Sequence, residues 1–459
     1  MATAPAILFL CLIAAALLSG FPVALALIAT SLAFALAASV LGVFDFTLLY
    51  AIPPRIFGVL TNPVLIAVPL FVFMGMVLEK SRMAEDMFAA ASNLFNRRAG
   101  GLLASVTMVG VLMAASTGIV GASVVTLGLL GLPALLKAGV KPSLASGSVA
   151  AAGTLGQIIP PAVVLIVLGD QMSNAYQKAQ TDSGNFAPDT VSVTDLFAGA
   201  LVPGILLAGL FVIYQLFVLR CDATSDEIDA GGAESGRGLA ALLAPLLLIV
   251  AVLGSILAGI ATPTEAASIG AVLALFLAFL RNRSFEFLNR ALTESVHLVS
   301  MIFLIVIAAS IFSLIFRVLG GDELVASFLG WLPGGTYGAL IGVMLLLFLL
   351  GFFLEFLEIT YMVVPLLAPV LLALPMTDGS AMSPVWLGVL IAINLQTSFL
   401  TPPFGVSLFY LRSVAPHEVS TNMIYRGVAP FVLLQLLALA LVLVFPQLAT
   451  WLPAALFGS

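Results

Sequence analysis

Scarcity of charge is the feature that most constrains this chain. Only 8% of its 459 residues are charged, whereas 62% are hydrophobic. About a quarter of the residues of an average soluble protein are charged, because its surface must be hydrated. This composition therefore excludes a soluble enzyme and predicts a polytopic membrane protein.

Several other classes find no support in the sequence. The 16 basic and 22 acidic residues give a net charge of −6 without a basic run, so nucleic-acid binding is not expected. Two cysteines and two histidines form no cluster for zinc, haem or iron–sulfur chemistry. The sequence has no nucleotide-binding loop of the kind that an ATP-driven pump needs. The N-terminus lacks the basic region of a cleavable signal peptide, so we expect the first apolar run to be retained as a transmembrane helix.

Apolar runs define the predicted membrane path, since a spanning helix needs about 20 apolar residues. Runs that meet or nearly meet this length are 5–19, 22–42, 62–78, 196–219, 239–260, 264–280, 298–318 and 428–448. Polar residues, Gly or Pro interrupt the stretches 100–118, 121–136, 144–168, 337–354, 358–374 and 385–411. Short amphipathic pieces, which suit helices lying along the interface, are 45–58, 82–97, 284–296 and 322–333.

Basic residues predict the orientation by the positive-inside rule. Four loops are placed in the cytoplasm by Lys80, Arg82, Arg97 and Arg98; Lys137 and Lys141; Arg281, Arg283 and Arg290; and Arg412 and Arg426. The loop 170–195 has four Asp against Lys178 and is placed outside. The segments 100–136 and 337–374 then become re-entrant hairpins from opposite sides, the N-terminus is outside, and 220–238 is inside despite its acidic residues.

An internal repeat is the strongest pattern. When residue 62 is laid against residue 298, the order of helices, interfacial pieces, hairpin and broken helix recurs. The double prolines Pro160–Pro161 and Pro402–Pro403 lie 242 positions apart. The basic residues place the two halves in opposite orientations. In secondary transporters, such an inverted-topology repeat locates substrate and ion sites at the corresponding broken helices.

Each double proline stops a helix, because proline lacks an N–H and clashes with the preceding turn. Inside a membrane the freed carbonyls need partners, and a bound cation can supply one. The half-helix that begins at Pro161 or Pro403 directs its positive N-terminus towards the same place, which suits an anion. The alternative is an ordinary proline kink, which two equivalent positions facing Gly- and Ser-rich hairpins make less favourable.

The two hairpin tips carry the remaining polar groups. The first tip, 116–126, combines Gly with hydroxyls that suit a small hard cation, although small residues could simply permit close helix packing. The second places Glu355 and Glu358 in an apolar stretch, where they could bind a cation, carry a proton or cap the backbone. Glu265, with Thr264, is typical of a helix start, so we assign it a structural role.

These motifs together resemble the large membrane subunit (DctM-like) of tripartite ATP-independent periplasmic (TRAP) transporters. The stretches that carry the resemblance, across nearly the whole chain, are 67–71, 121–126, 153–161, 196–204, 262–266, 351–355 and 401–405. The resemblance implies an all-α membrane protein of two inverted repeats with an elevator mechanism. It further implies sodium-driven import of an organic acid across the bacterial inner membrane, a periplasmic substrate-binding protein, and a small four-helix (DctQ-like) subunit.

The same resemblance divides the chain into a scaffold and a mobile transport domain. Scaffold helices are expected in 1–80 and 239–320, and interfacial arms in 81–98 and 321–335. The halves of the transport domain are expected in 99–220 and 336–450, with a cytoplasmic linker at 221–238. Two departures stand out: Val120 and Ala122 replace hydroxyls of the usual Ser-Gly-Ser-Ser tip, and Ala162 replaces a Ser. Backbone carbonyls would therefore supply more of the sodium ligands in this half.

The predicted ligands follow from the tips and breaks, with sodium as the coupling ion and no other cofactor. Sodium is assigned in the first half to Gly121, Ser123, Thr126, Gly153, Gly156 and Pro161. In the second half it is assigned to Gly351, Glu355, Thr397 and Thr401. The substrate is assigned to Ser123, Pro161, Ala162, Pro403 and Gly405.

The substrate carboxylate is expected between the two half-helix N-termini, because Arg317 lies near the outer end of its helix and the other basic residues fall in loops. One alternative is a self-sufficient sodium- or proton-coupled carrier of a dicarboxylate or another anion that needs no binding protein. Another class, a membrane-embedded enzyme or proton-pump subunit, would need chains of ionisable groups, and only Glu355, Glu358 and Arg317 are available.

Overall fold

The computed structural model describes residues 4–95, 99–117, 120–186, 191–221, 238–281, 285–376, 379–403 and 405–458, without the side chains of 114–117, 221 and 238–241. Over these ranges the chain is helical, and its β-structure is confined to an isolated bridge between Pro375 and Ala381. The predicted all-α class is confirmed. Arg97, Arg98, Arg283 and nearly all of the predicted linker 221–238 lie outside the described residues.

The helices of the first half are α1 (Ala4–Leu18), α2 (Val23–Val40), η1 (Phe46–Ala51), α3 (Ile52–Leu60), α4 (Ala67–Lys80), α5 (Met83–Leu94), α6 (Ala99–Thr117), α7 (Val120–Lys137), α8 (Pro142–Thr154), η2 (Leu155–Gln157), α9 (Val163–Asp182) and α10 (Val193–Cys221). Those of the second half are α11 (Gly238–Leu257), α12 (Pro263–Arg281), α13 (Glu286–Val318), α14 (Gly321–Trp331), α15 (Gly335–Leu350), α16 (Phe356–Glu358), η3 (Ile359–Val363), α17 (Val364–Leu372), α18 (Pro384–Leu400), α19 (Val406–Val414), α20 (Thr421–Val444) and α21 (Gln447–Phe457).

Six of the described helices are long and apolar enough to cross a membrane, namely α2, α7, α10, α12, α13 and α20. Large apolar side chains on them stay exposed, among them Phe276 of α12 and Leu433 of α20. Such a surface would aggregate in water but is the natural face towards lipid. The chain is therefore a multi-pass membrane protein, as its composition predicts.

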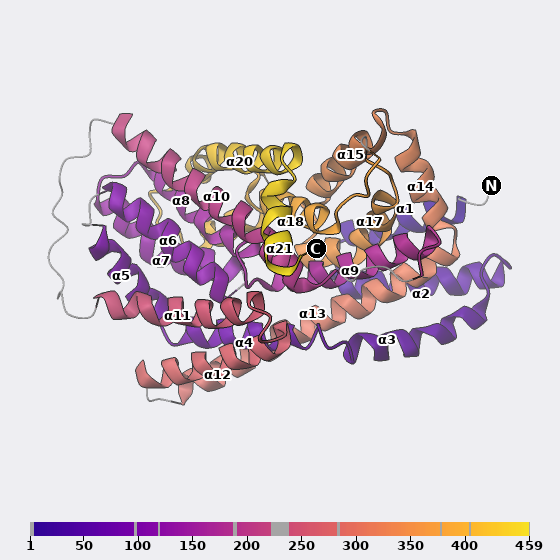
Figure 1. Cartoon of the computed structure of the whole chain (residues 1–459), viewed down its shortest axis with the longest axis horizontal. Coiled ribbons are helices and arrows are strands. Elements are labelled where there is room, and N and C mark those ends of the chain that lie inside the picture. The colour runs from indigo at the N-terminus through magenta and orange to yellow at the C-terminus, as the bar shows by residue number, and fades with distance from the viewer. Residues whose placement is uncertain are drawn as a thin grey trace.

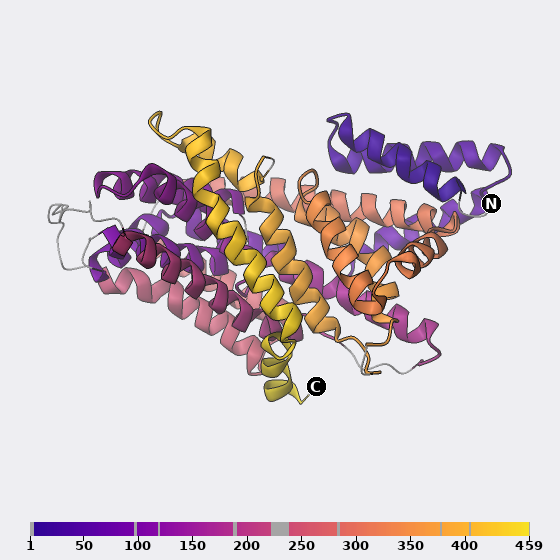
Figure 2. The same ribbon diagram turned by 90° about the horizontal axis from the view of Figure 1, so that it is seen from above.

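The helices form an elongated body with the two halves interleaved (Figure 1). Helices α5, α6 and α7 lie at one end, α1, α14 and α15 lie at the other, and the long α13 connects the middle to that second end (Figure 1). Seen from above, α20 runs obliquely across the centre of the molecule (Figure 2). Helix α14 meets α15 at 115°, so the chain bends sharply between these two helices.

Helix packing follows the predicted repeat. Helices at corresponding places in the two halves make corresponding contacts. Helix α8 packs on α20 as α18 packs on α10, α9 packs on α17 as α19 packs on α7, and α4 packs on α12 as α13 packs on α2. The amide of Gln396 also donates a long 3.5 Å hydrogen bond to the hydroxyl of Thr154, and these residues are 242 positions apart, like the double prolines. This reciprocity supports the repeat, while the opposite orientation of the halves stays a prediction.

Three sequence-based boundaries are wrong. The piece 284–296 is not a separate interfacial helix, because α13 contains neither Gly nor Pro and runs unbroken from Glu286 to Val318. Helix α4 begins at Ala67 rather than at 62, because the side chain of Asn62 accepts the Val64 N–H at 2.9 Å and holds a turn. Much of the predicted outer loop 170–195 is helical, since α9 continues to Asp182.

The start of α12 is a capping box. The backbone N–H and the hydroxyl of Thr262 donate to Glu265 Oε2 at 2.8 and 2.9 Å, and the Glu265 N–H donates to the Thr262 hydroxyl at 3.3 Å. This geometry supports the structural role expected of Glu265. The capping residue is Thr262, however, and not Thr264, whose hydroxyl donates to the Pro63 carbonyl at 2.8 Å.

Removing this cap gives the first testable expectation. Thr262→Ala should lower the free energy of unfolding by about 1 kcal/mol, because it leaves helix N-terminal N–H groups without an acceptor. The melting temperature of the purified protein in detergent measures the change. Thr293→Ala is the matched control, since that exposed hydroxyl only returns to its own helix at the Asn289 carbonyl. Equal melting temperatures for the two variants would contradict the assignment.

Candidate functional site at two broken helices

The first break separates α8 from α9. Helix α8 ends at Thr154, η2 adds one tight turn, and the Pro160–Pro161 peptide bond is cis. Ala162 has an extended backbone and is the N-cap of α9, which begins at Val163. Every residue from Gly153 to Ala162 is buried. The half-helix therefore begins two residues after Pro161, slightly later than the sequence predicts.

The second break has the same design. Helix α18 ends at Leu400, Thr401 is extended, the Pro402–Pro403 peptide bond is cis, and α19 begins at Val406 after its N-cap Gly405. A Cβ at Gly405 would lie 2.6 Å from the Phe399 carbonyl oxygen, so only glycine fits here. Phe404, part of the matching motif, lies outside the described residues.

Both half-helices begin without a side-chain cap among the described residues. The first N–H groups of a helix lack intrahelical partners and carry the positive end of its dipole. Ala162 and Gly405 at these N-caps are both buried. No described side chain therefore occupies either N-terminus. Pro403, predicted as a substrate contact, is exposed, and its carbonyl accepts the Tyr425 hydroxyl at 3.2 Å.

The predicted hydroxyl ligands of the second break have defined orientations. Thr397 donates to the Ile393 carbonyl at 2.8 Å, and Thr401 donates to the Thr397 carbonyl at 2.7 Å. A hydroxyl has one proton and two lone pairs, so donating back to the helix leaves acceptor capacity free. Thr397 is buried and Thr401 is half-buried. Both hydroxyl oxygens can therefore still coordinate a cation.

The second hairpin tip contacts this break directly. A Cβ at Gly351 would coincide with the side chain of Ser398 on α18. In the same tip, Glu358 Oε2 accepts the Glu355 N–H at 2.9 Å, and the Glu355 side chain accepts the N–H of Glu358 in return. Of the three roles open to these carboxylates, backbone capping is the one that the geometry displays. Cation binding by Glu355 stays a prediction.

The first hairpin tip is only partly described. Gly118 and Ile119 lie outside the described residues, as do the side chains of Ser116 and Thr117. Beyond the tip, a Cβ at Gly121 would lie 2.9 Å from the ring of Tyr410 on α19, and one at Gly153 would collide with Val124 on α7. Ser123 is buried and Thr126 half-buried on α7. Both tips therefore approach broken helices.

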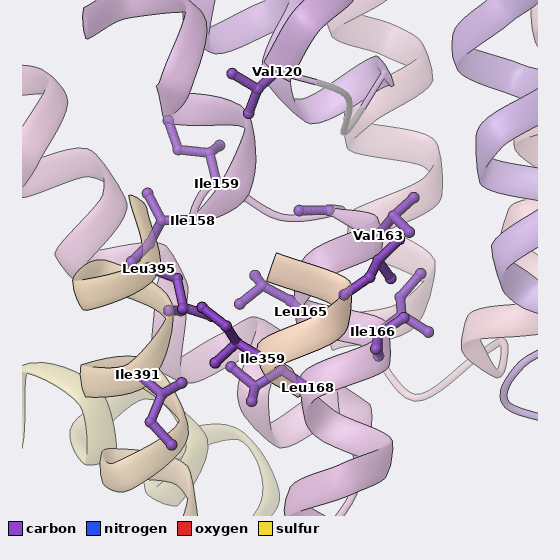
Figure 3. Packing of buried hydrophobic residues seen from close by; sticks show 14 of the residues in the cluster. Val120, Ile158, Ile159, Val163, Leu165, Ile166, Leu168, Ile359, Ile391 and Leu395 are labelled. Carbon is purple, nitrogen blue, oxygen red and sulfur yellow. The ribbon is translucent and has the colours of Figure 1, made fainter. Parts of the chain in front are cut away.

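Apolar side chains enclose the first break. Figure 3 shows Ile158 beside Leu395 of α18, and Ile359 of η3 close to Leu165 and Leu168 of α9. Within this packing, both amide atoms of Gln157 are buried without a hydrogen-bond partner in the described chain.

A buried amide without hydrogen-bond partners costs free energy. Gln157 is therefore a candidate binding residue of this site, which the sequence-based assignment omitted. A Gln in the middle of an apolar break was the available signal. Gly156 and Pro161, which flank this region, are buried as well.

A polar cavity of about 420 Å³ is the feature that sequence reasoning missed. Arg55, Lys178 and Arg317 line it, together with Asp170 and Tyr361. The expectation that basic residues other than Arg317 fall in loops is wrong, because Arg55 lies in α3 and Lys178 in α9. Asp170, placed by sequence in an outer loop, is buried on α9 and accepts the Asn62 amide at 2.9 Å.

A membrane protein built around two broken helices, each met by a hairpin, has the architecture of a transporter. The fold is shared with the Alcanivorax borkumensis YdaH transporter at a TM-score of 0.61 and 16% identity, over 89% of each chain. It is also shared with Neisseria gonorrhoeae MtrF at a TM-score of 0.54 and 12% identity, over 84% of this chain and 81% of the other.

The family model for the DctM component of tripartite ATP-independent periplasmic transporters matches residues 10–448 of this sequence, so the chain belongs to that family. The sialic acid large permease SiaM of Vibrio cholerae is 28% identical, over 96% of this chain and 97% of its own. The C4-dicarboxylate permease DctM of the same species is 28% identical over 86% of each chain. The ectoine permease TeaC of Halomonas elongata is 26% identical, over 84% of this chain and 86% of its own. The family comprises multi-pass permeases of the bacterial inner membrane.

Proposed function

We propose that this chain is the permease subunit of a secondary transporter that imports an organic acid anion together with sodium. A periplasmic binding protein delivers the substrate, and a small DctQ-like subunit of four helices completes the membrane part. Family membership supports the permease role, and the named relatives transport sialic acid, C4-dicarboxylates or ectoine.

The pair of uncapped half-helix N-termini is the observation that carries this proposal. A carboxylate in a low-dielectric site must be compensated, since an unpaired buried charge is very costly. The N–H groups that follow Ala162 and Gly405 supply that compensation, and we assign the Ser123 hydroxyl to the same substrate. Pro161 and Pro403 fix where these half-helices start.

Sodium binds, in this proposal, to oxygens at the tips and breaks. In the first half these belong to Gly121, Gly153 and Gly156, with Ser123 and Thr126 adding hydroxyls. In the second half they belong to Gly351, Thr397 and Thr401. A cation next to the carboxylate also explains coupling, because each ligand then raises the affinity of the other by the same factor.

Hydroxyl removal tests these ligands. Ser123→Ala and Thr401→Ala should each raise the sodium concentration for half-maximal uptake about fivefold, as expected when one hydroxyl contact of about 1 kcal/mol is lost. Initial uptake rates at graded sodium concentrations measure this change. Ser268→Ala is the control, since that exposed hydroxyl on α12 only returns to its own helix. Unchanged sodium dependence in both variants would rule out these ligands.

Labelling from outside tests the predicted orientation. We expect an impermeant maleimide to label Ser183→Cys from outside intact cells, in a background where both native cysteines are serine. Ser183 is exposed at the end of α9, next to the acidic segment placed outside by the positive-inside rule. Labelling only after the membrane is opened would reverse the orientation.

Partner dependence separates this proposal from its alternative. The permease is reconstituted with or without the small subunit, and uptake of sialic acid, succinate and ectoine is measured with and without the binding protein. Uptake that requires both partners supports the tripartite mechanism. Full uptake by the permease alone would instead support a self-sufficient dicarboxylate carrier.

A further inference from the structure

The polar cavity is separate from the two breaks and has its own chemistry. Helices α3 and α13 line it on one side, with Arg55 and Arg317, and α9, η3 and α17 line it on the other. The first group falls in the predicted scaffold and the second in the predicted transport domain. In the predicted orientation the cavity lies on the periplasmic side, because Arg317 is in the last turn of α13.

Positive charge in the cavity exceeds what the surrounding chain neutralises. Asp170 is the only carboxylate among the described lining residues. Its Oδ1 accepts the Asn62 amide at 2.9 Å, and its Oδ2 accepts the Gln171 amide at 2.9 Å, so its oxygens are held by neutral donors. Lys178 and Arg317 share Asp322 of α14, at 2.6 and 4.0 Å. One carboxylate therefore serves two cations.

Arg55 has no ion pair in the part of the chain that the structure describes, and it lines the same cavity. Arg317 Nε and the Tyr361 hydroxyl are buried there without a hydrogen-bond partner among the described residues, and Tyr361 is only 5% exposed. Buried donors left unpaired cost free energy, so such groups normally have a ligand or water. These donors converge on a space whose size is typical of small-molecule sites.

We propose that this cavity is a periplasmic vestibule that binds the carboxylate of the incoming organic acid before it reaches the broken helices. Arg55 and Arg317 attract and hold the carboxylate, and Tyr361 donates to it. Guanidinium groups suit this task because they bind carboxylates through two parallel hydrogen bonds. The identity of the anion as the transported substrate rests on the proposed function.

Charge-selective labelling tests the vestibule without a transport assay. Ser310 lines the cavity and is half-buried. In the complex with the small subunit, in phosphatidylcholine vesicles and with Cys11 and Cys221 replaced by serine, Ser310→Cys is reacted with an anionic or a cationic methanethiosulfonate. The anionic-to-cationic rate ratio should exceed that of exposed Ser183→Cys about tenfold, as expected for electrostatic focusing.

Arg55→Gln combined with Arg317→Gln should return this ratio to the Ser183→Cys value, whereas Arg55→Lys combined with wild-type Arg317 should preserve it. Arg290→Gln is the charge-matched control, because Arg290 is exposed and pairs only with Glu286 at 2.6 Å among the described residues. Succinate should slow labelling by the anionic reagent at constant ionic strength, and neutral succinamide should not.

A ratio equal to that of Ser183→Cys, or one that survives the double arginine variant, would overturn the proposal. Protection by phosphatidylglycerol in the vesicles, with none from succinate, would assign the cavity to a lipid headgroup and also overturn it. These labelling experiments use no sodium gradient and no binding protein. Their failure would therefore leave the proposed transport function standing, and loss of sodium coupling would leave the vestibule standing.

Discussion

Gly351→Ala is expected to reduce uptake at least about tenfold, as overpacking by about 1–3 kcal/mol at this tight contact implies. An added Cβ would occupy the position of the Ser398 side chain on α18. It would lie 2.5 Å from Ser398 Cβ, whose position is fixed by the backbone, so a change of the serine rotamer does not relieve the clash. The second hairpin tip would be pushed away from its broken helix.

The same geometry predicts rescue by a second substitution. Gly351→Ala combined with Ser398→Gly moves the methyl-sized volume across the interface and should restore most of the uptake. Gly254→Ala is the control, because a Cβ at Gly254 would meet no described atom within 4 Å. Initial uptake rates and surface expression are measured for all variants. A double variant as inactive as Gly351→Ala would contradict this account of the contact.

Gly153 provides a contrasting test of the same reasoning. A Cβ there would lie 3.0 Å from Val124 Cα and 3.1 Å from Val124 N, in addition to colliding with the valine side chain. Trimming the side chain by Val124→Ala removes only part of the obstruction. We therefore expect Ser398→Gly to restore most of the uptake lost in Gly351→Ala, but Val124→Ala to restore little of the uptake lost in Gly153→Ala.

Ala162→Leu is expected to abolish uptake. Ala162 is fully buried at the N-cap of α9, and the larger side chain would displace the N–H groups that we propose hold the carboxylate. Overpacking of this kind costs about 1–3 kcal/mol, which a membrane protein of this size can survive as a folded chain. Gly405→Leu is not an equivalent test, because any Cβ at Gly405 approaches the backbone at Phe399 and would disturb folding itself.

Ala251→Leu is the matched control, since Ala251 is exposed on α11. Uptake is compared with the melting temperature and with recovery of the complex with the small subunit. Loss of uptake with an intact complex supports a functional role for the α9 N-terminus. Normal uptake by Ala162→Leu would show that the substrate does not use that N-terminus.

The sequence predicts this fold well where a single residue type has a strong local effect. The double prolines locate both breaks, and the Thr-Pro-Thr-Glu motif locates the start of α12 to within two residues. Prediction fails where a helix continues through polar residues. Asp170 follows an apolar run and Lys178 lies further along, yet α9 continues past both because the Asn62 amide donates to Asp170 and Asp322 pairs with Lys178.

The cavity was beyond the reach of sequence reasoning because tertiary packing brings distant residues together. Arg55 and Arg317 are 262 positions apart, and no local pattern indicates that α3 and α13 bring them to one space. Gln157 was visible in its motif, but only the packing around the first break shows that its amide is buried and unpaired.

Sodium coupling is the central claim, and one measurement tests it most directly. Vesicles that contain the permease and small subunit receive the binding protein and a transported organic acid, while sodium and proton gradients are imposed separately at a fixed membrane potential. An inward sodium gradient should drive accumulation above the external concentration, and a proton gradient without sodium should not. Accumulation driven by protons in the absence of sodium would contradict the account.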